Sequence, residues 1–508
     1  MSNFKKQKVS EVVTCDNLIA GKRTPPQGGK YLNVESATTG AHIGNVALST
    51  AADVDAAVAA AQAAGPAWRS LTMKSRAAIM FKLHMLLKDH ADELAEIIML
   101  ENGKNSTEAG GDVAKGNETV EWATSMPQSC QGKRLEVSRG VTCEDHRDPV
   151  GIVACVVPFN FPLMVPMWTT PIALTCGNCV ILKPSEKVPL TMNRVADLVA
   201  EAGVPPGVFQ MIHGQVEPVT ALCDHPGVDA VTFVGSSKVA QIVSRRCRAL
   251  DKRCLALGGA KNHLVILPDC DPAMAAQDIL VSFAGSAGQR CMAASVLVTV
   301  GDCSPVLAKL VEMAKSVKPG QGKAEVGPVI DAASHANIMK YLKEAEDGGA
   351  EFLVDGRHWA EEHKNGSWCG PTIVKHTNKA DRLLHDEIFG PVLSIISVDT
   401  HDEALAIENG SPYGNAACIY TSCGAHAEYF TKRFRAGMLG VNVGVPVPRE
   451  PFSFGGMYGT LSKYGDMDIT GDGCVEFMTT RRKVTTKWAR PAAVAYQPVD
   501  KANFDGAI

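Results

Sequence analysis

The stretch GIVACVVPFNFP, residues 151–162, predicts a buried β-strand that ends in a turn. Its apolar run shows no polar alternation, which is typical of a strand covered on both faces, as in a parallel sheet. Similar short runs follow, each separated from the next by a segment of helical character: CVILKPSE (179–186), VFQMIHG (208–214), AVTFVGSS (230–237) and HLVILP (263–268). This alternation predicts βαβ units and an α/β fold with a parallel sheet.

The segments on either side follow other patterns. Residues 51–104 place apolar side chains three and four positions apart, which predicts helices. A second α/β region is expected from about residue 271 to 440, with strands at ASVLVTV, GPVI, FGPVLSIISV and AACIYTS. Beyond residue 450 we expect loops, then an edge strand at RRKVTTKWA (481–489) and a poorly packed tail after residue 491.

The composition is that of a soluble globular protein: 508 residues, 45% hydrophobic and 20% charged, enough for two or three domains. A formal net charge of −4 does not indicate a nucleic-acid or membrane partner, and no apolar run reaches the roughly 18 residues of a membrane helix. The 16 cysteines are scattered and lack zinc-ligand spacing, so we expect reduced thiols and no metal site. The amino-terminal stretch has no apolar signal core, which favours the cytoplasm, or alternatively the mitochondrial matrix.

Polar side chains follow three of the predicted strands, at the edge where parallel sheets bind ligands. Asn160 lies between two aromatic residues and either shapes the turn or donates to a developing oxyanion. Lys183 and Glu186 offer the donors and acceptors that suit a ribose diol, or else form a solvated ion pair. Ser236 opens a predicted helix whose free N–H groups suit a pyrophosphate.

Three further stretches carry candidate groups. ALGGAKNH (256–263) is a glycine-rich turn that either lines a pocket or connects two elements. GQRCMA (288–293) places Cys291 after a predicted helix; such a cysteine is usually packing, but the adjacent Arg290 would favour a reactive thiolate. HDEIFGP (385–391) carries Glu387, either an exposed loop acid or a carboxylate of the same site.

In order and spacing, these stretches closely resemble the aldehyde dehydrogenase superfamily over roughly residues 30–490. Within it, VPFNFPLMVPMW (157–168), GGAKNH (258–263), GQRCMA and GMLGVNVGVPVP (437–448) resemble the methylmalonate-semialdehyde (malonate-semialdehyde) dehydrogenase family, a branch that acylates coenzyme A. The resemblance implies an aldehyde dehydrogenase-like α/β fold, with a Rossmann-type cofactor domain, an α/β catalytic domain and a small β extension for oligomerisation.

The resemblance also implies roles for single residues. Cys291 matches the family's nucleophile and Asn160 its oxyanion-hole amide, with the backbone N–H of Cys291 as the second donor. Cofactor contacts are implied for Val157, Phe159, Lys183, Glu186, Lys187, Ser236, Gly258 and Glu387. Because the Glu186 carboxylate would repel a 2′-phosphate, we expect NAD rather than NADP.

The group that hydrolyses the acyl-enzyme in ordinary members of the superfamily is missing from this sequence. In those enzymes a glutamate stands just before the Leu-Gly-Gly turn; alignment on Lys261 puts Leu257 there, and a one-residue shift puts Ala256 there. Neither side chain accepts a proton, and loss of a general base typically costs ~10²–10⁴ in the step that it serves. We therefore expect an external thiol, coenzyme A, to take the acyl group, giving acetyl-CoA or propionyl-CoA after decarboxylation.

A substrate carboxylate requires a cation. Arg290 matches the family arginine that can bind it bidentately. A second family arginine falls on Lys115, which keeps the charge but loses the fork, so an aldehyde other than malonate semialdehyde or methylmalonate semialdehyde stays open. The alternatives are a hydrolytic NAD-dependent dehydrogenase of another small aldehyde, using a base such as Glu387, and a catalytically silent binding protein on the same scaffold.

The expected domain division is 1–142 with 160–265 for NAD binding, 266–465 for catalysis, and 143–159 with 466–508 for the oligomerisation extension and tail. Within the extension, strands near 143–155 should pair with residues 481–489. Their exposed edge would need a partner chain, so a homodimer or homotetramer is expected.

Overall fold

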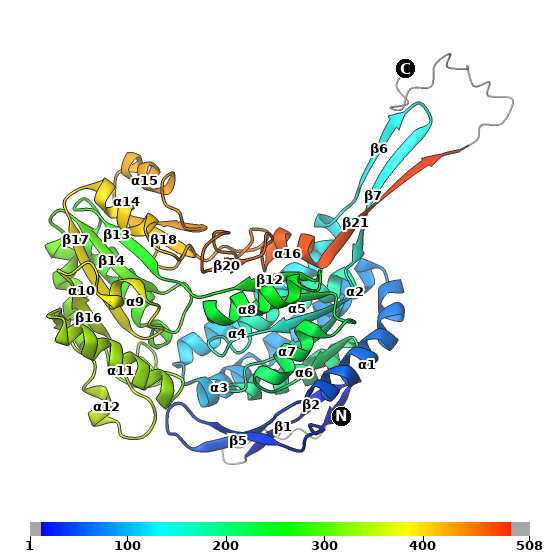
Figure 1. The fold of residues 1–508 in the computed structure, drawn as a ribbon, viewed down its shortest axis with the longest axis horizontal. Coiled ribbons are helices and arrows are strands. Elements are labelled where there is room, and N and C mark those ends of the chain that lie inside the picture. Colours follow the sequence, from blue (N-terminus) through cyan, green and yellow to red (C-terminus); the bar gives the residue numbers. More distant parts are fainter. Residues whose placement is uncertain (1–11, 489–508) are drawn as a thin grey trace.

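The computed structural model describes residues 12–488. Figure 1 shows two α/β lobes side by side and a β-arm that projects from one of them. Four sheets organise these parts, with eight, seven, three and three strands. The predicted α/β class, with parallel strands covered by helices, is confirmed.

The first lobe is built on the eight-stranded sheet, in the order β20-β12-β11-β8-β9-β10-β2-β3. Its parallel strands are β8 (Ile152–Val156), β9 (Cys179–Lys183), β10 (Phe209–Met211), β11 (Ala230–Val234) and β12 (Arg253–Leu257). Antiparallel strands extend both edges: β2 (Asn17–Ile19), β3 (Lys22–Thr24) and β20 (Lys463–Tyr464). The first four predicted apolar runs are therefore neighbours in one parallel sheet.

The strand order of this sheet changes direction beside β8. The chain runs from β8 through β9 to β10 on one side and returns to β11 and β12 on the other. Ligands of open parallel sheets bind outside the carboxyl ends of the strands at such a switch point. Residues 157–160 follow β8 and residues 235–237 follow β11, so both turns lie there.

Helices cover this sheet, and the helical prediction for residues 51–104 is confirmed. The helices of the lobe are α1 (Ala51–Ser70), α2 (Met73–Asp89), α3 (Ala91–Asn102), α4 (Ser106–Ser129), α5 (Met164–Cys176), α6 (Pro189–Ala202), α7 (Val216–Asp224) and α8 (Ser237–Arg248). Asn105 caps α4 by accepting the Glu108 backbone N–H at 2.8 Å, which satisfies one of the free donors at the helix start. Below α1 and α6 lies a three-stranded sheet of β1 (Val13–Cys15), β5 (His42–Ala47) and β4 (Tyr31–Glu35).

The second lobe is built on the seven-stranded sheet, in the order β15-β16-β17-β14-β13-β18-β19. Its strands are β13 (Asn262–Ile266), β14 (Ala294–Val300), β15 (Glu351–Val354), β16 (Thr372–Lys375), β17 (Val392–Val398), β18 (Ala416–Tyr420) and β19 (Met438–Val441), with β15 alone antiparallel to its neighbour. Alternate residues point to separate cores: Leu264 and Leu297 to one, Val265 and Val298 to the other. Both faces are thus buried, which explains the continuous apolar runs.

Helices and a short 3₁₀ turn connect these strands. They are α9 (Pro272–Ala284), the 3₁₀ turn η1 (Gly285–Gly288), α10 (Ser304–Ser316), α11 (Ala332–Asp347), α12 (Trp359–Glu362), α13 (Arg382–His385), α14 (His401–Asn409) and α15 (Gly424–Thr431). Two local expectations differ from the structure. The GPVI segment (327–330) forms no strand, and the expected loops after residue 450 contain α16 (Gly471–Met478).

The arm is a three-stranded antiparallel sheet in the order β21-β7-β6. Strand β7 (Val141–Pro149) pairs with β21 (Thr479–Lys487) along nine residues and with β6 (Lys133–Ser138) on its other side. The expected pairing with residues 481–489 is thus found, but Ile152–Val156 is not part of it, because β8 pairs with β9 and β11 in the large sheet. Strand β6, expected in the cofactor domain, belongs to the arm.

The tail after residue 491 lies outside the described residues. Among residues 12–488, there is no helix that combines the length and the apolar character needed to cross a membrane. The same part of the chain holds no group of three His, Cys, Asp or Glu side chains arranged for a metal ion.

Candidate active site

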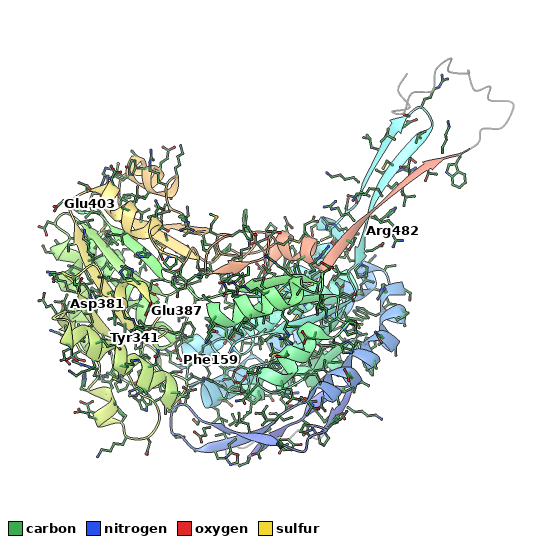
Figure 2. The ribbon with its side chains drawn as sticks, in the orientation of Figure 1. Phe159, Tyr341, Asp381, Glu387, Glu403 and Arg482 are labelled. Carbon is green, nitrogen blue, oxygen red and sulfur yellow. The ribbon has the colours of Figure 1, made fainter. Side chains whose placement is uncertain are left out.

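The two large sheets meet at the ends of their strands, not along their edge strands. Strand β12 ends at Leu257, a glycine-rich turn follows, and β13 begins at Asn262. The carboxyl edge of the first sheet therefore meets the amino edge of the second, where the segments that precede β14, β17 and β18 also lie. Figure 2 shows Phe159 and Glu387 in this region, each contributed by a different lobe.

Cys291 lies in a turn of unusual backbone geometry between α9 and β14. Ser286, Ala287 and Gly288 have φ values of 49°, 51° and 69° in succession, a left-handed conformation that costs energy at non-glycine residues. A Cβ at residue 288 would lie 2.0 Å from the Gly390 carbonyl oxygen, so only glycine fits there. The turn therefore packs directly on the loop that carries Glu387.

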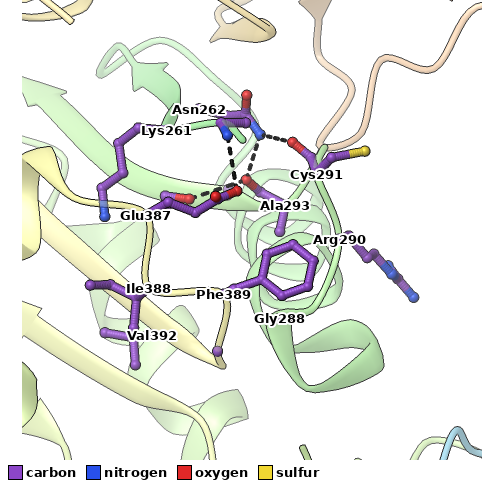
Figure 3. Close-up of a pocket in the computed structure, with 14 residues that line it drawn as sticks. Lys261, Asn262, Gly288, Arg290, Cys291, Ala293, Glu387, Ile388, Phe389 and Val392 are labelled. Atoms are coloured by element: carbon purple, nitrogen blue, oxygen red, sulfur yellow. Dashed lines mark hydrogen bonds between the residues drawn. The ribbon is translucent and has the colours of Figure 1, made fainter. Parts of the chain in front are cut away.

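Two asparagines hold the backbone of Cys291. Asn262 Nδ2 donates to the carbonyl oxygens of Cys291 and Ala293, both at 2.8 Å, and Figure 3 shows these bonds. Asn415 Nδ2 donates to the same Cys291 oxygen at 2.9 Å. Because Asn262 begins β13 and Asn415 precedes β18, two strands of the second sheet fix the position of the predicted nucleophile.

Asn160 meets the turn from the opposite lobe. Its side chain is 5% exposed, and Nδ2 donates to the Gln289 carbonyl oxygen at 2.9 Å. The amide carries two N–H groups, so one of them stays free for a further acceptor. The structure thus brings Asn160 to the turn of Cys291, as an oxyanion-hole pair would require.

Arg290 does not lower the pKa of the Cys291 thiol, contrary to the expectation from their adjacency. Burial, reinforced by the Glu387 carboxylate, raises the pKa of the Cys291 thiol to about 12. The Arg290 guanidinium is instead engaged by Glu108 of α4, with Nη2 to Oε1 at 3.1 Å, and by the Ser286 hydroxyl at 3.2 Å. Because the Glu108 carboxylate offsets the charge of Arg290, the guanidinium does little to stabilise a thiolate at Cys291.

Glu387 lies on the glycine-rich turn rather than in solvent. Its Oε1 accepts the Ala260 backbone N–H at 2.9 Å, and a Cβ on Gly259 would lie 2.1 Å from Oε2. Burial raises the pKa of this carboxyl to about 7, opposed by the charge of Lys261. Burial also lowers the pKa of the Lys261 ammonium to about 7. The interpretation of Glu387 as an exposed loop acid is therefore wrong.

The candidate cofactor residues lie along the carboxyl edge of the first sheet. Lys183 is 5% exposed and contacts Glu186, with Nζ to Oε2 at 3.1 Å, while burial lowers the pKa of the lysine. A solvated surface pair would not be buried in this way. The Val157 N–H donates to the Lys183 carbonyl oxygen at 3.2 Å, which joins the ends of β8 and β9.

Among the other cofactor candidates, Lys187 and Phe159 contact the second lobe, and Ser236 lies at the start of helix α8. Lys187 Nζ lies 2.6 Å from Asp331 Oδ2 and 5.2 Å from the centre of the Phe159 ring, which meets Phe389 edge to face. Ser236 is exposed at the start of α8 and its hydroxyl makes no capping hydrogen bond there.

Gly258, the last cofactor candidate, lies where two backbone segments approach each other closely. A Cβ at this position would lie 2.2 Å from the Leu461 carbonyl oxygen. The Gly258 N–H donates to the neighbouring Ser462 carbonyl oxygen at 2.9 Å. The glycine is therefore required by the packing of the turn against residues 461–462, whatever it contacts in addition.

A cavity of about 960 Å³ opens on the other side of Cys291. Its apolar wall includes Met164, Trp168, Leu280, Val281, Val445 and Phe454, and its cationic side chains are Lys115, Arg290, Lys323 and Arg449. In Figure 3 the Cys291 thiol and the Arg290 side chain point to one side of the turn and Glu387 lies on the other. Cys291 therefore stands between a small pocket shared with Glu387 and the large cavity that contains Lys115.

The two residues that we expect at the place of the hydrolytic glutamate are buried and apolar. Leu257 is 3% exposed, ends β12 and pairs with Val234 and Lys463 on the two neighbouring strands. Ala256 is fully buried one residue earlier. Both belong to the apolar cluster that includes Met292, against which Cys291 packs.

Comparison with known proteins supports the resemblance. Residues 24–484 match the model of the aldehyde dehydrogenase family. The chain belongs to the aldehyde dehydrogenase family. It is 42% identical over 482 residues to malonate-semialdehyde dehydrogenase 2 of Geobacillus kaustophilus (strain HTA426), covering 94% of this chain and 99% of that protein. Malonate-semialdehyde dehydrogenase 1 of Oceanobacillus iheyensis is 41% identical over 484 residues, covering 94% of this chain and 99% of that protein.

Solved structures of this aldehyde dehydrogenase family have the same fold. A putative methylmalonate-semialdehyde dehydrogenase from Sinorhizobium meliloti, complexed with NAD, superposes with a TM-score of 0.92 at 37% identity, covering 95% of this chain and all of that one. The methylmalonate-semialdehyde dehydrogenase of Oceanimonas doudoroffii gives the same values. The predicted family and aldehyde dehydrogenase-like fold are confirmed.

Sequence reasoning missed four residues that shape this site. Asn262 and Asn415 hold the Cys291 carbonyl, Glu108 engages Arg290, and Arg449 joins Lys115 at the cavity. A polar residue at or directly before the start of a buried strand was the available signal for the two asparagines. Nothing local marked Glu108 or Arg449, because their partners are distant in sequence.

Proposed function

We propose that this protein oxidises malonate semialdehyde or methylmalonate semialdehyde with NAD and transfers the decarboxylated acyl group to coenzyme A, giving acetyl-CoA or propionyl-CoA. The proposal is supported by the position of Asn160 at the turn of Cys291, where Nδ2 donates to the Gln289 carbonyl oxygen, and by the buried apolar side chains of Ala256 and Leu257, where we expect ordinary members to carry the hydrolytic base. The names of the relatives are consistent with it.

The chain's own residues fit NAD. Lys183 and Glu186 offer an ammonium and a carboxylate at 3.1 Å from each other, a set that both donates to and accepts from ribose hydroxyls. The start of α8, with the Ser236 hydroxyl not used for capping, suits a pyrophosphate. Val157, Phe159, Lys187, Gly258 and Glu387 are the further contacts we propose. When bound, NAD supplies the hydride acceptor.

The first half of the reaction uses Cys291 and Asn160. The Cys291 sulfur bonds to the aldehyde carbon, and the carbonyl electrons move to oxygen, where the free Asn160 N–H and the Cys291 backbone N–H stabilise the charge. Because the thiol pKa is about 12, its proton must leave to an acceptor. The thiol points away from Glu387 and into the large cavity, so we assign the proton to solvent water there. Loss of hydride then leaves a thioester on Cys291.

The second half releases the acyl group without a general base. In a malonyl-type thioester the bond to CO₂ breaks, and its electron pair moves into the thioester carbonyl as an enolate that takes up a proton. The thiol of coenzyme A then attacks the carbonyl carbon, Cys291 leaves with the electron pair of its C–S bond, and the proton of the coenzyme A thiol ends on the Cys291 sulfur. Thiol exchange needs less base assistance than hydrolysis, which is consistent with apolar side chains at residues 256 and 257.

Arg290 and Lys115 are the side chains that we propose for the substrate carboxylate. The terminal nitrogens of Arg290 keep N–H groups beyond those used for Glu108 and Val281, so a two-point contact is available. Lys115, whose Nζ lies 2.7 Å from Glu118, brings a second cation to the same cavity.

The proposal is tested by product analysis. Purified enzyme incubated with NAD, coenzyme A and malonate semialdehyde should form NADH, CO₂ and acetyl-CoA in equal amounts, measured by absorbance, a carbonate trap and mass spectrometry. Propanal provides the control, since it should give propionyl-CoA without CO₂. Formation of free malonate as the product would contradict the proposal.

Leu257→Glu should convert the enzyme toward hydrolysis. A carboxyl in this buried position has a raised pKa and can activate water, so NADH formation without coenzyme A should rise by ~10²-fold. Leu257→Gln is the matched control, because it introduces a polar group of the same size that cannot take a proton. Thermal unfolding of both variants separates catalysis from the cost of burying polarity. If neither Leu257→Glu nor Ala256→Glu accelerates hydrolysis, the placement of the missing base is wrong.

The alternative is a hydrolytic enzyme that uses Glu387 as its base. Its raised pKa of about 7 favours this role. In that case turnover would be equally fast without coenzyme A, would yield a free acid, and would fall in Glu387→Gln.

We further propose that the arm pairs with a second copy of the chain, giving a homodimer or homotetramer, and that the enzyme works in the cytoplasm. The arm leaves Leu135, Val137 and Val484 exposed, an apolar edge that a partner would cover. Light scattering of the purified protein tests the assembly, and a monomer would contradict it.

A further inference from the structure

A carboxylate at the cavity holds two cations side by side. Glu118 Oε1 accepts from Lys115 Nζ at 2.7 Å, and Glu118 Oε2 lies 3.3 Å from Arg449 Nη1. Lys115 and Glu118 lie on α4, whereas Arg449 comes from the segment between β19 and β20. The next residue of that segment, Glu450, accepts the Thr119 hydroxyl at 2.9 Å, so the segment is fastened to α4 where Arg449 reaches it.

Both cations line the cavity into which Cys291 opens. Each is about two-fifths exposed, so neither is sealed off from a ligand. Lys115 has two donors beyond the one given to Glu118, and Arg449 has the rest of its fork. A small anion in the cavity could therefore meet both side chains while Glu118 keeps them in place.

Two other pairs of opposite charge at the cavity are separate from Lys115 and Arg449. Arg290 is balanced by Glu108 at 3.1 Å, and Asp112 is balanced by Lys104 at 2.6 Å. Lys115 and Arg449 share the carboxylate of Glu118, and the neighbouring Glu450 accepts the Thr119 hydroxyl, so both cations keep N–H donors beyond their contacts with Glu118. A single carboxylate between the two side chains would accept from both.

We propose that Arg449 is a specificity-determining residue that joins Lys115 and Arg290 in binding the substrate carboxylate, with Glu118 as the positioning residue for Lys115 and Arg449. The inference rests on the proposed function, since it names the group that recognises the semialdehyde. It also accounts for the lysine at residue 115. A lysine there lacks a planar fork, and Arg449 supplies one from a different segment of the chain.

The test compares a charged and an uncharged aldehyde of the same length. Arg449→Leu should raise KM for malonate semialdehyde by about tenfold or more, the usual effect of losing a charge-assisted hydrogen bond. The kcat/KM for propanal, which has no carboxylate, should change by less than about twofold, and kcat for malonate semialdehyde should change little. Lys115→Arg in the Arg449→Leu background should restore most of the loss, because it returns a fork to the same place.

Two controls separate recognition from general electrostatics and from folding. Lys323→Leu removes a cation from the same cavity that is not bonded to Glu118 and should leave the preference unchanged. Arg449→Lys keeps the charge and should retain part of the affinity. Equal effects of Arg449→Leu on both aldehydes, no effect on either, or an equal loss in Lys323→Leu would each overturn the inference. Failure of the proposed function looks different, because the unaltered enzyme would then form free malonate in place of acetyl-CoA, or would show no preference for malonate semialdehyde over propanal.

Discussion

Cys291→Ser is expected to lower NADH formation from malonate semialdehyde by about 10⁴-fold or more. A serine hydroxyl is a far weaker nucleophile at neutral pH than a cysteine sulfur, and this site has no adjacent histidine to activate it among the residues lining either pocket. The reaction should stop before any acyl-enzyme forms, and coenzyme A should not restore it. Stopped-flow absorbance at the NADH band measures the loss.

Cys291→Ser should keep the stability and the NAD affinity of the unaltered enzyme. The backbone carbonyl of Cys291, not its sulfur, receives the Asn262 and Asn415 hydrogen bonds, and serine preserves that carbonyl. The midpoint of thermal unfolding and the Kd for NAD should therefore stay close to those of the unaltered enzyme. Undiminished NADH formation by Cys291→Ser would contradict the enzymatic account as a whole.

Asn160→Ala is expected to lower the rate of acyl-enzyme formation by ~10²–10³, the usual cost of removing one oxyanion donor. One N–H of the side chain holds the Gln289 carbonyl oxygen at 2.9 Å, two residues before the nucleophile. The loss therefore combines a missing donor to the oxyanion with a looser turn. The rate of the first NADH turnover reports this step directly.

Asn160→Asp is the matched control for this prediction. Aspartate has the same shape but no N–H, so both contacts are lost without creating a cavity. Its effect should be at least as large as that of Asn160→Ala, while the Kd for NAD should stay the same in both. A loss below about threefold in both variants would remove Asn160 from the proposed mechanism.

The parts of this fold that the sequence predicts are those with a local signal. Fully apolar runs such as residues 152–156 and 179–183 indicate strands buried on both faces, and β8 and β9 follow. The three- and four-residue periodicity of residues 51–104 indicates α1, α2 and α3. The sheet to which a strand belongs is harder to predict, because it depends on distant residues. Residues 152–156 were expected in the arm, but they pair with β9 and β11, which come later in the sequence.

The candidate site divides in the same way. Asn160 and Lys183 stand in recognisable strings at the ends of strands, and Cys291 and Glu387 in strings that precede strands, so the sequence indicates them. The partner of Arg290 does not follow from its neighbours, because Glu108 comes from a helix in the other lobe. The pKa of Cys291 does not follow either, because burial and the Glu387 carboxylate raise it. Arg449 meets Lys115 only because a distant segment is fastened to α4.

The succession of left-handed residues at 286–288 was also not predictable. Alanine and serine disfavour positive φ on their own, and the conformation persists because the surrounding structure holds it. Ser286 N–H donates to Glu108 Oε1 at 2.6 Å, which ties the turn to α4. A strained turn of this kind is defined by its tertiary partners and leaves no pattern in the sequence around it.

The central claim is that the thioester on Cys291 waits for a thiol because residues 256 and 257 offer no base. The most direct measurement mixes enzyme, NAD and malonate semialdehyde without coenzyme A and follows NADH over time. We predict a burst of one NADH per Cys291, then turnover slower by ~10²–10⁴ than with coenzyme A present, and rapid resumption when coenzyme A is added. Continuous turnover at an unchanged rate without coenzyme A, with a free acid as product, would contradict the account.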